Sequence, residues 1–172
     1  MSDTILAHND YDYDAMIVGF PGQETMFLAN FLSRKPIIFD VFTSHYGGHV
    51  LDREKHGRNS LSAKWYRWLD KKSVNLAETA LLDTDAHIDF FVNELGLPRE
   101  KFQRVFVGTD SDIFYPREIK KDADKFLVHF HGNYIPLQGT EYIISAAKLL
   151  EKENVFFNLI GRGQTYQSDR DL

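Results

Sequence analysis

Short apolar runs alternate along the chain with amphipathic segments. Six runs rich in Val, Ile and Phe are predicted strands: Ala15–Val18, Pro36–Phe42, Ala80–Leu82, Phe102–Val107, Lys125–Phe130 and Val155–Ile160. Several are apolar on both faces, which is typical of parallel strands buried between helices.

Helical periodicity separates these runs. Gln23–Leu32 follows a Pro-Gly turn, and Asp85–Leu95 and Thr140–Leu150 each carry apolar residues at the i, i+3, i+4, i+7 spacing of one buried stripe. Asp83-Thr84-Asp85 is better explained as a helix N-cap than as a catalytic carboxylate pair. The alternation predicts βαβ units, hence an α/β fold with a Rossmann-like parallel sheet and flanking helices.

One stretch, residues 108–125, interrupts the alternation with Pro116 and a cluster of charges. We interpret it as a junction between two α/β domains. The boundaries we expect are an N-terminal domain over 1–115, a linker over 116–124 and a second domain over 125–172. A long surface loop within one domain is the alternative.

Composition narrows the class of protein. The 20 Lys and Arg residues are outnumbered by 25 Asp and Glu, and the net charge of −5 argues against a nucleic-acid partner. The chain has no Cys, which excludes disulfides and thiolate metal sites. No apolar run reaches the roughly 18 residues of a membrane span, and the acidic start does not resemble a signal peptide. We therefore expect a cytoplasmic protein.

Three segments resemble family 4 glycosyltransferases of the GT-B fold. They are DYDAMIVGFPGQETMFLANFLSRKPIIFDVFTS, VFVGTDSDIFYPR and FLVHFHGNYIPLQGTEYIISAAKLLEKENVFFNLIGRG. They look like the middle of that family's N-terminal domain, the domain junction and the opening βαβ of the C-terminal domain. The resemblance implies the middle portion of such an enzyme, truncated at both ends, with incomplete N-terminal and C-terminal domains.

This resemblance implies an activity. A hexose would pass from a nucleotide-sugar, UDP- or GDP-linked, to an acceptor hydroxyl with retained configuration, and neither a cofactor nor a metal would be required. The nucleotide-sugar would contact Gly132, Asn133, Gln138, Gly139, Gly161, Arg162 and Gly163. Backbone N–H groups beside Gly132, Gly139 and Gly163 could then face the diphosphate, because helix starts attract anions. Alternatively, Gly139 only permits a turn before a helix.

Two positions depart from the family pattern. Asn133 and Gln138 stand where many members carry Arg and Lys. Each lost charge-assisted hydrogen bond would cost phosphate binding about 1.5–3 kcal/mol. A second hypothesis is therefore a non-catalytic α/β remnant that acts as a scaffold or requires a partner chain.

The acceptor side would lie at the carboxyl end of the first strands. Gly19, Gly22 and Glu24 form a turn where open α/β sheets bind ligands, although a plain strand-to-helix turn explains them equally well. The family resemblance suggests His45 as an acceptor-side catalytic residue, with Phe42 an alternative occupant of that position. His45 and His49 without a carboxylate are a weak metal pair.

A basic stretch stands out against this acidic chain. Residues 52–72 hold seven basic and three acidic residues, a local charge of +4, and both tryptophans. One interpretation is a solvated helix that packs Trp65, Trp68 and Leu69 inward. The other is that residues 53–72 attract an anionic membrane surface, which would make the protein peripheral to the membrane.

The last two strands are too few for a complete domain. We expect Lys125–Phe130 and Val155–Ile160 either to join the N-terminal sheet or to be covered in a homo-oligomer or by a complementing chain.

Overall fold

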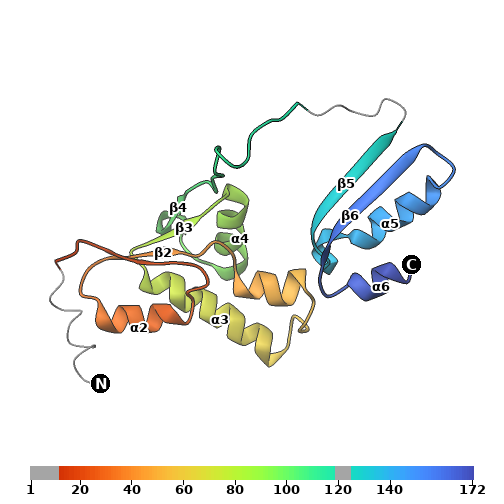
Figure 1. Ribbon diagram of the computed structural model, residues 1–172. Helices are drawn as coiled ribbons and strands as arrows, with labels where there is room; N and C mark the ends of the chain where they lie inside the picture. The colour runs from red at the N-terminus through yellow and green to blue at the C-terminus, as the bar shows by residue number, and fades with distance from the viewer. Residues whose placement is uncertain (1–11, 119–124) are drawn as a thin grey trace, which may run out of the picture. The chain divides into compact units, whose positions relative to one another are not determined.

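The computed structural model describes residues 12–118 and 125–172, which form parts of two compact units (Figure 1). Of the described residues, 12–51 and 56–108 belong to the first unit, and 52–55, 109–118 and 125–172 belong to the second. Residues 1–11 lie outside the described part of the chain, and so do residues 119–124 of the linker expected over 116–124.

Four parallel strands form the sheet of the first unit, in the order β1-β2-β3-β4. They are β1 (Met16–Val18), β2 (Ile37–Asp40), β3 (Thr79–Leu82) and β4 (Phe102–Arg104). Val18 is paired with Phe39, and Phe39 with Ala80. The α/β fold class and the parallel sheet are confirmed.

Helices connect these strands, because neighbouring parallel strands must be joined by a crossover that is usually helical. They are α2 (Thr25–Leu32), the π-helical turn η2 (Gly47–Asp52), α3 (Leu61–Leu76), α4 (Asp85–Leu95) and the 3₁₀ turn η3 (Arg99–Lys101). The N-cap expected at residues 83–85 is confirmed, because Thr84 Oγ1 accepts a hydrogen bond from the His87 amide. Gly96 then ends α4 in the left-handed conformation, at φ 66°.

The core of the first unit lies between the sheet and its helices. Its fully buried side chains include Met26, Phe39, Val41, Leu69, Val74, Leu82, Phe91 and Leu95. The interpretation that helix α3 packs Trp65, Trp68 and Leu69 inward is wrong for both tryptophans. Leu69 is buried, but Trp65 and Trp68 are 52% and 42% exposed.

The second unit contains its own two-stranded sheet. Its elements are β5 (Phe126–Asn133), the 3₁₀ turn η4 (Pro136–Gln138), α5 (Thr140–Leu149), β6 (Val155–Arg162) and α6 (Tyr166–Arg170). β5 and β6 are parallel from the Phe126–Val155 pair to the Asn133–Arg162 pair. The expectation that these strands join the N-terminal sheet is therefore wrong. Eight residues of each strand pair with the other strand, and within the described residues neither strand pairs with a strand of the first unit.

Candidate functional site

The turn after β1 is shaped by close backbone packing. A Cβ atom on Gly22 would lie 2.5 Å from the Gly19 carbonyl oxygen and 2.6 Å from Cγ1 of Val18, so only glycine fits. Gly19 itself has open space around its Cα. The turn leads directly into α2, and Glu24 precedes the helix with an exposed carboxylate.

Two predicted acceptor-side residues meet at this edge of the sheet. His45 follows β2, and its Nδ1 lies 3.9 Å from the Glu24 carboxylate. The Nδ1 atom is buried and has no hydrogen-bond partner among the described residues. An imidazole nitrogen beside a carboxylate can take part in proton transfer from a bound hydroxyl. The structure thus brings together His45 and Glu24, which the sequence separates by 21 positions.

A buried carboxylate holds the loop that presents His45. Asp70 on α3 accepts hydrogen bonds from Ser44 Oγ at 2.6 Å and from the amides of His45 and Tyr46 at 3.0 and 2.9 Å. Burial raises the pKa of this carboxyl above its ordinary value of 3.8, while the three hydrogen bonds act in the opposite direction. Sequence reasoning missed Asp70, because nothing in its spacing separates it from the surrounding basic helix.

Aromatic rings surround His45 on the other side. His49 stacks on Tyr66 at 4.7 Å between ring centres, and His45 meets His49 edge-on at 5.8 Å. Within residues 12–118 and 125–172, no group of three or more His, Asp or Glu side chains is arranged to hold a metal ion.

A small hollow adjoins the carboxyl ends of β2, β3 and β4. It has a volume of about 180 Å³, and its lining includes Asp40, Asp83 and Phe106. Asp40 therefore lies beside a cavity at the edge where parallel sheets bind ligands.

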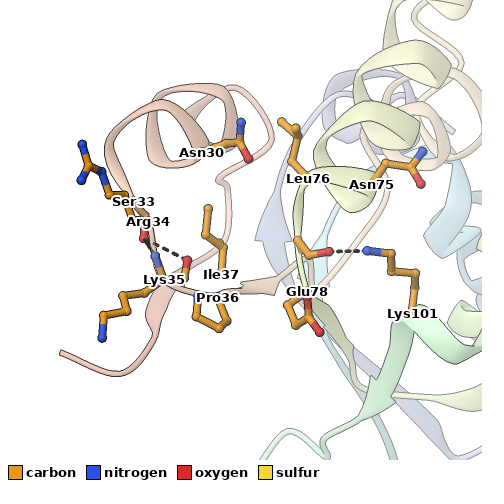
Figure 2. A pocket seen from close by; sticks show the side chains of 11 residues that line it. Asn30, Ser33, Arg34, Lys35, Pro36, Ile37, Asn75, Leu76, Glu78 and Lys101 are labelled. Atoms are coloured by element: carbon orange, nitrogen blue, oxygen red, sulfur yellow. Dashed lines mark hydrogen bonds between the residues drawn. The ribbon is translucent and has the colours of Figure 1, made fainter.

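A larger hollow lies at the opposite edge. It has a volume of about 430 Å³ and lies where β2, β3 and β4 begin. Its lining includes Arg34, Lys35, Glu78 and Lys101 (Figure 2). The Lys101 ammonium donates to the Ala77 carbonyl. Sequence reasoning did not find this hollow, because its lining comes from strand starts and loops with no shared motif.

In the second unit, the glycines expected to contact a nucleotide lie close together in the sheet. Gly132 pairs with Gly161, and a Cβ on Gly161 would lie 1.9 Å from the Gly132 carbonyl oxygen. Gly163 has φ 155°, and its Cβ would lie 2.4 Å from the carbonyl oxygen of Tyr134. Close approach of two backbone segments therefore accounts for Gly161 and Gly163 without a ligand.

Gly139 also has a structural reason. Its φ of 59° is left-handed, and its amide donates to the Pro136 carbonyl at 3.1 Å. That amide is already used within η4. At the start of α5, the Thr140 hydroxyl donates to the buried Asp169 carboxylate, which also accepts from Thr165 Oγ1 at 2.7 Å.

A cavity of about 400 Å³ in the second unit is lined by some of the residues predicted for the donor site. Asn133 and Gly163 line it together with Ile135, Gln164, Arg53 and Lys55. Gln164 Nε2 donates to the Arg53 carbonyl at 3.1 Å. Gly132, Gln138, Gly139, Gly161 and Arg162 do not line this cavity. The two cationic residues of this lining, Arg53 and Lys55, belong to the basic stretch and were not predicted as part of the donor site.

Comparison with known proteins shows the fold. No protein family and no curated protein matches the sequence. Among solved structures, the chain resembles TarM of S. aureus, a GT-B glycosyltransferase. The TarM structure compared first is that of its G117R mutant in complex with Fondaparinux, alpha-GlcNAc-glycerol and UDP. The TM-score is 0.63 at 13% identity over 97% of this chain. A second TarM structure gives 0.64 at 13% identity and the same coverage.

This chain spans about a third of TarM, 32% of its length in both structures. At this identity the similarity establishes a glycosyltransferase fold and no closer relationship. Among the described residues, no helix is both long and apolar enough to cross a bilayer.

Proposed function

We propose that this chain is part of a family 4-like glycosyltransferase that moves a hexose from a nucleotide-sugar to an acceptor hydroxyl with retained configuration. The observation that carries the proposal is the alignment of 97% of the chain, both units included, with a GT-B glycosyltransferase. The reaction breaks the bond between the sugar carbon and the diphosphate oxygen, whose electron pair stays with the diphosphate. The acceptor oxygen bonds to that carbon and loses its proton.

The first unit would receive the acceptor. The His45 side chain is 16% exposed and its buried Nδ1 faces Glu24, so an acceptor hydroxyl would approach the imidazole from its exposed edge. Glu24, at 3.9 Å, would stabilise the imidazolium if the proton is transferred. Asp70 fixes the backbone that carries His45, and we expect it to act through this positioning.

The second unit would hold the diphosphate in the cavity of Asn133 and Gly163. Lys55 and Arg53 line the same cavity and supply the positive charge that Asn133 and Gln138 lack. From the sequence, the diphosphate was assigned to backbone amides beside Gly132, Gly139 and Gly163. We propose the two cationic side chains instead, because the Gly139 amide already donates a hydrogen bond to the Pro136 carbonyl.

Isothermal titration calorimetry with UDP-glucose and GDP-mannose tests the donor site. Lys55→Glu should weaken binding at least tenfold, because it places a carboxylate beside the diphosphate. Lys152→Glu, an equal charge change on an exposed residue after α5, should leave the affinity unchanged. Equal affinity of Lys55→Glu and the unaltered chain would place the nucleotide elsewhere.

Release of free nucleotide in the presence of acceptor sugars tests the reaction. His45→Ala should reduce turnover about 10²–10⁴-fold, the usual contribution of a general acid–base residue. His87→Ala removes an exposed histidine that pairs with Asp83 and serves as the control. The scaffold hypothesis is favoured by the neutral Asn133 and Gln138. It would replace ours if the folded chain bound neither nucleotide-sugar.

A further inference from the structure

Helices α2 and α3 of the first unit present apolar and basic side chains together on their outer surfaces. On α3, Leu61, Lys64, Trp65, Trp68, Lys71 and Lys72 are all exposed and recur at the spacing of one helix face. The opposite face buries Ala63, Leu69 and Val74. The exposed face is therefore the more aromatic of the two, which a solvated helix does not require.

Side chains from α2 extend this face. Phe27 stacks on Trp68 with 5.7 Å between ring centres, and Trp68 stacks on Trp65 at 4.9 Å. Phe31 and Leu61 are each 83% exposed. We call the set Phe27, Phe31, Leu61, Trp65 and Trp68 with Lys64, Lys71 and Lys72 the aromatic–lysine surface.

The charges on this surface have one sign. None of its three lysines forms an ion pair within the described part of the chain, whereas Arg67 on the same helix is engaged with Glu94. The only acidic residue of α3, Asp70, is buried and bonded to the 44–46 loop. The lysines are therefore available to an anionic partner.

We propose that the aromatic–lysine surface binds the headgroup region of an anionic lipid bilayer. Tryptophan and phenylalanine favour that region, and lysines can extend their ammonium groups to lipid phosphates. A second copy of the chain fits poorly, because a symmetric contact would bring lysines against lysines. The proposal is independent of glycosyl transfer.

The two tryptophans of the sequence both lie on this surface, so intrinsic fluorescence reports on it directly. Vesicles of phosphatidylcholine with about 40% anionic phosphatidylglycerol should shift the emission to the blue and protect it from acrylamide. Pure phosphatidylcholine vesicles should do neither. High salt should release the chain from the charged vesicles.

Charge reversal supplies the matched comparison. Lys64→Glu, Lys71→Glu and Lys72→Glu combined should weaken vesicle binding at least a hundredfold, since each lysine contributes about fivefold. The same reversal at Lys148, Lys152 and Arg170 in the second unit changes net charge equally and should have little effect. Phe31→Ser with Leu61→Ser should weaken binding while keeping both tryptophans.

Other occupants give different results, and each overturns the proposal. Tryptophan emission that is blue and acrylamide-resistant without vesicles would show the surface covered by another part of the protein. A concentration-dependent shift with dimers in light scattering would identify a second copy. Equal loss in both triple variants would indicate non-specific charge attraction, and no response to charged vesicles would exclude a membrane partner.

Discussion

At the scale of single residues, the glycines of β5 and β6 mark a close approach of backbones. Gly161 in β6 lies against the carbonyl oxygen of Gly132, and Gly163, just after β6, lies against the carbonyl oxygen of Tyr134. A family resemblance assigned these glycines to a nucleotide. The structure adds an explanation that holds with or without a ligand, so conservation of these glycines alone would not prove binding.

Replacing Gly161 with alanine tests this packing. Its Cβ would lie 1.9 Å from the Gly132 carbonyl, so the strands must separate. We expect a loss of about 1–3 kcal/mol in the free energy of unfolding, as for other overpacked sites. Urea denaturation followed by circular dichroism measures it. Gly108→Ala, where nothing lies within 4 Å of the added carbon, is the control. Equal stability of both variants would contradict this packing.

Asp70 gives a prediction about pH. Because burial raises its pKa in the folded protein, the folded state binds more protons than the unfolded state between pH 3.8 and the raised value. The stability contributed by Asp70 should therefore fall as pH rises through that window. Denaturation of the unaltered chain and Asp70→Asn across pH 3.5–8 isolates the effect as their difference. A difference that stays constant or grows with pH would refute it.

The sequence indicated part of the acceptor-side cluster by two routes. Glu24 was predicted because it follows the first strand at the edge where parallel sheets bind ligands, and His45 was predicted from the family resemblance. Asp70 could not be found in this way. It lies in the middle of a helix, and its partners are backbone amides whose positions depend on tertiary packing.

At the scale of elements, α4 matched its predicted range because local signals at both ends agree. Thr84 caps its start, Gly96 ends it, and one apolar stripe lies between. Helix α3 was harder, because its aromatic residues suggest a buried face that the fold does not use. Hydrophobic periodicity locates a helix but does not decide which side is covered when both faces carry large apolar groups.

The N-cap of α3 offers a stability test at this scale. Ser60 Oγ accepts a hydrogen bond from the Ala63 amide at 3.1 Å. Ser60→Ala should destabilise the first unit by about 1 kcal/mol, a typical cost of losing an N-cap. Ser62→Ala, one position inside the helix, should be neutral or slightly stabilising. Thermal unfolding distinguishes them, and the reverse order would mean that the cap bond is not formed.

At the scale of the whole molecule, the two units differ in buried apolar surface. Among the described residues, the buried hydrophobic side chains belong to the first unit except for Tyr134. The sequence indicated a change near residues 108–125. It did not indicate that residues 52–55 group with the second unit, because such grouping depends on contacts between distant segments.

Hydrogen exchange should reveal this difference. Amides of β5, β6 and α5 should exchange faster than those of β2 and β3, because local opening is easier where little apolar surface is buried. Exchange followed by mass spectrometry on peptides from each unit measures both sets in one sample. Slower exchange in β5 and β6 would show that the second unit is covered by something else, such as another copy of the chain.

The shared carboxylate of Asp169 constrains how this protein can change through evolution. Thr140 and Thr165 both donate to it, from positions 29 and 4 residues away. An apolar replacement at either threonine would remove one of the hydrogen bonds to a buried charge, and loss of Asp169 would leave two hydroxyls without their acceptor. Homologous sequences should therefore vary at these three positions together, so that the start of α5 and the start of α6 are inherited as one unit.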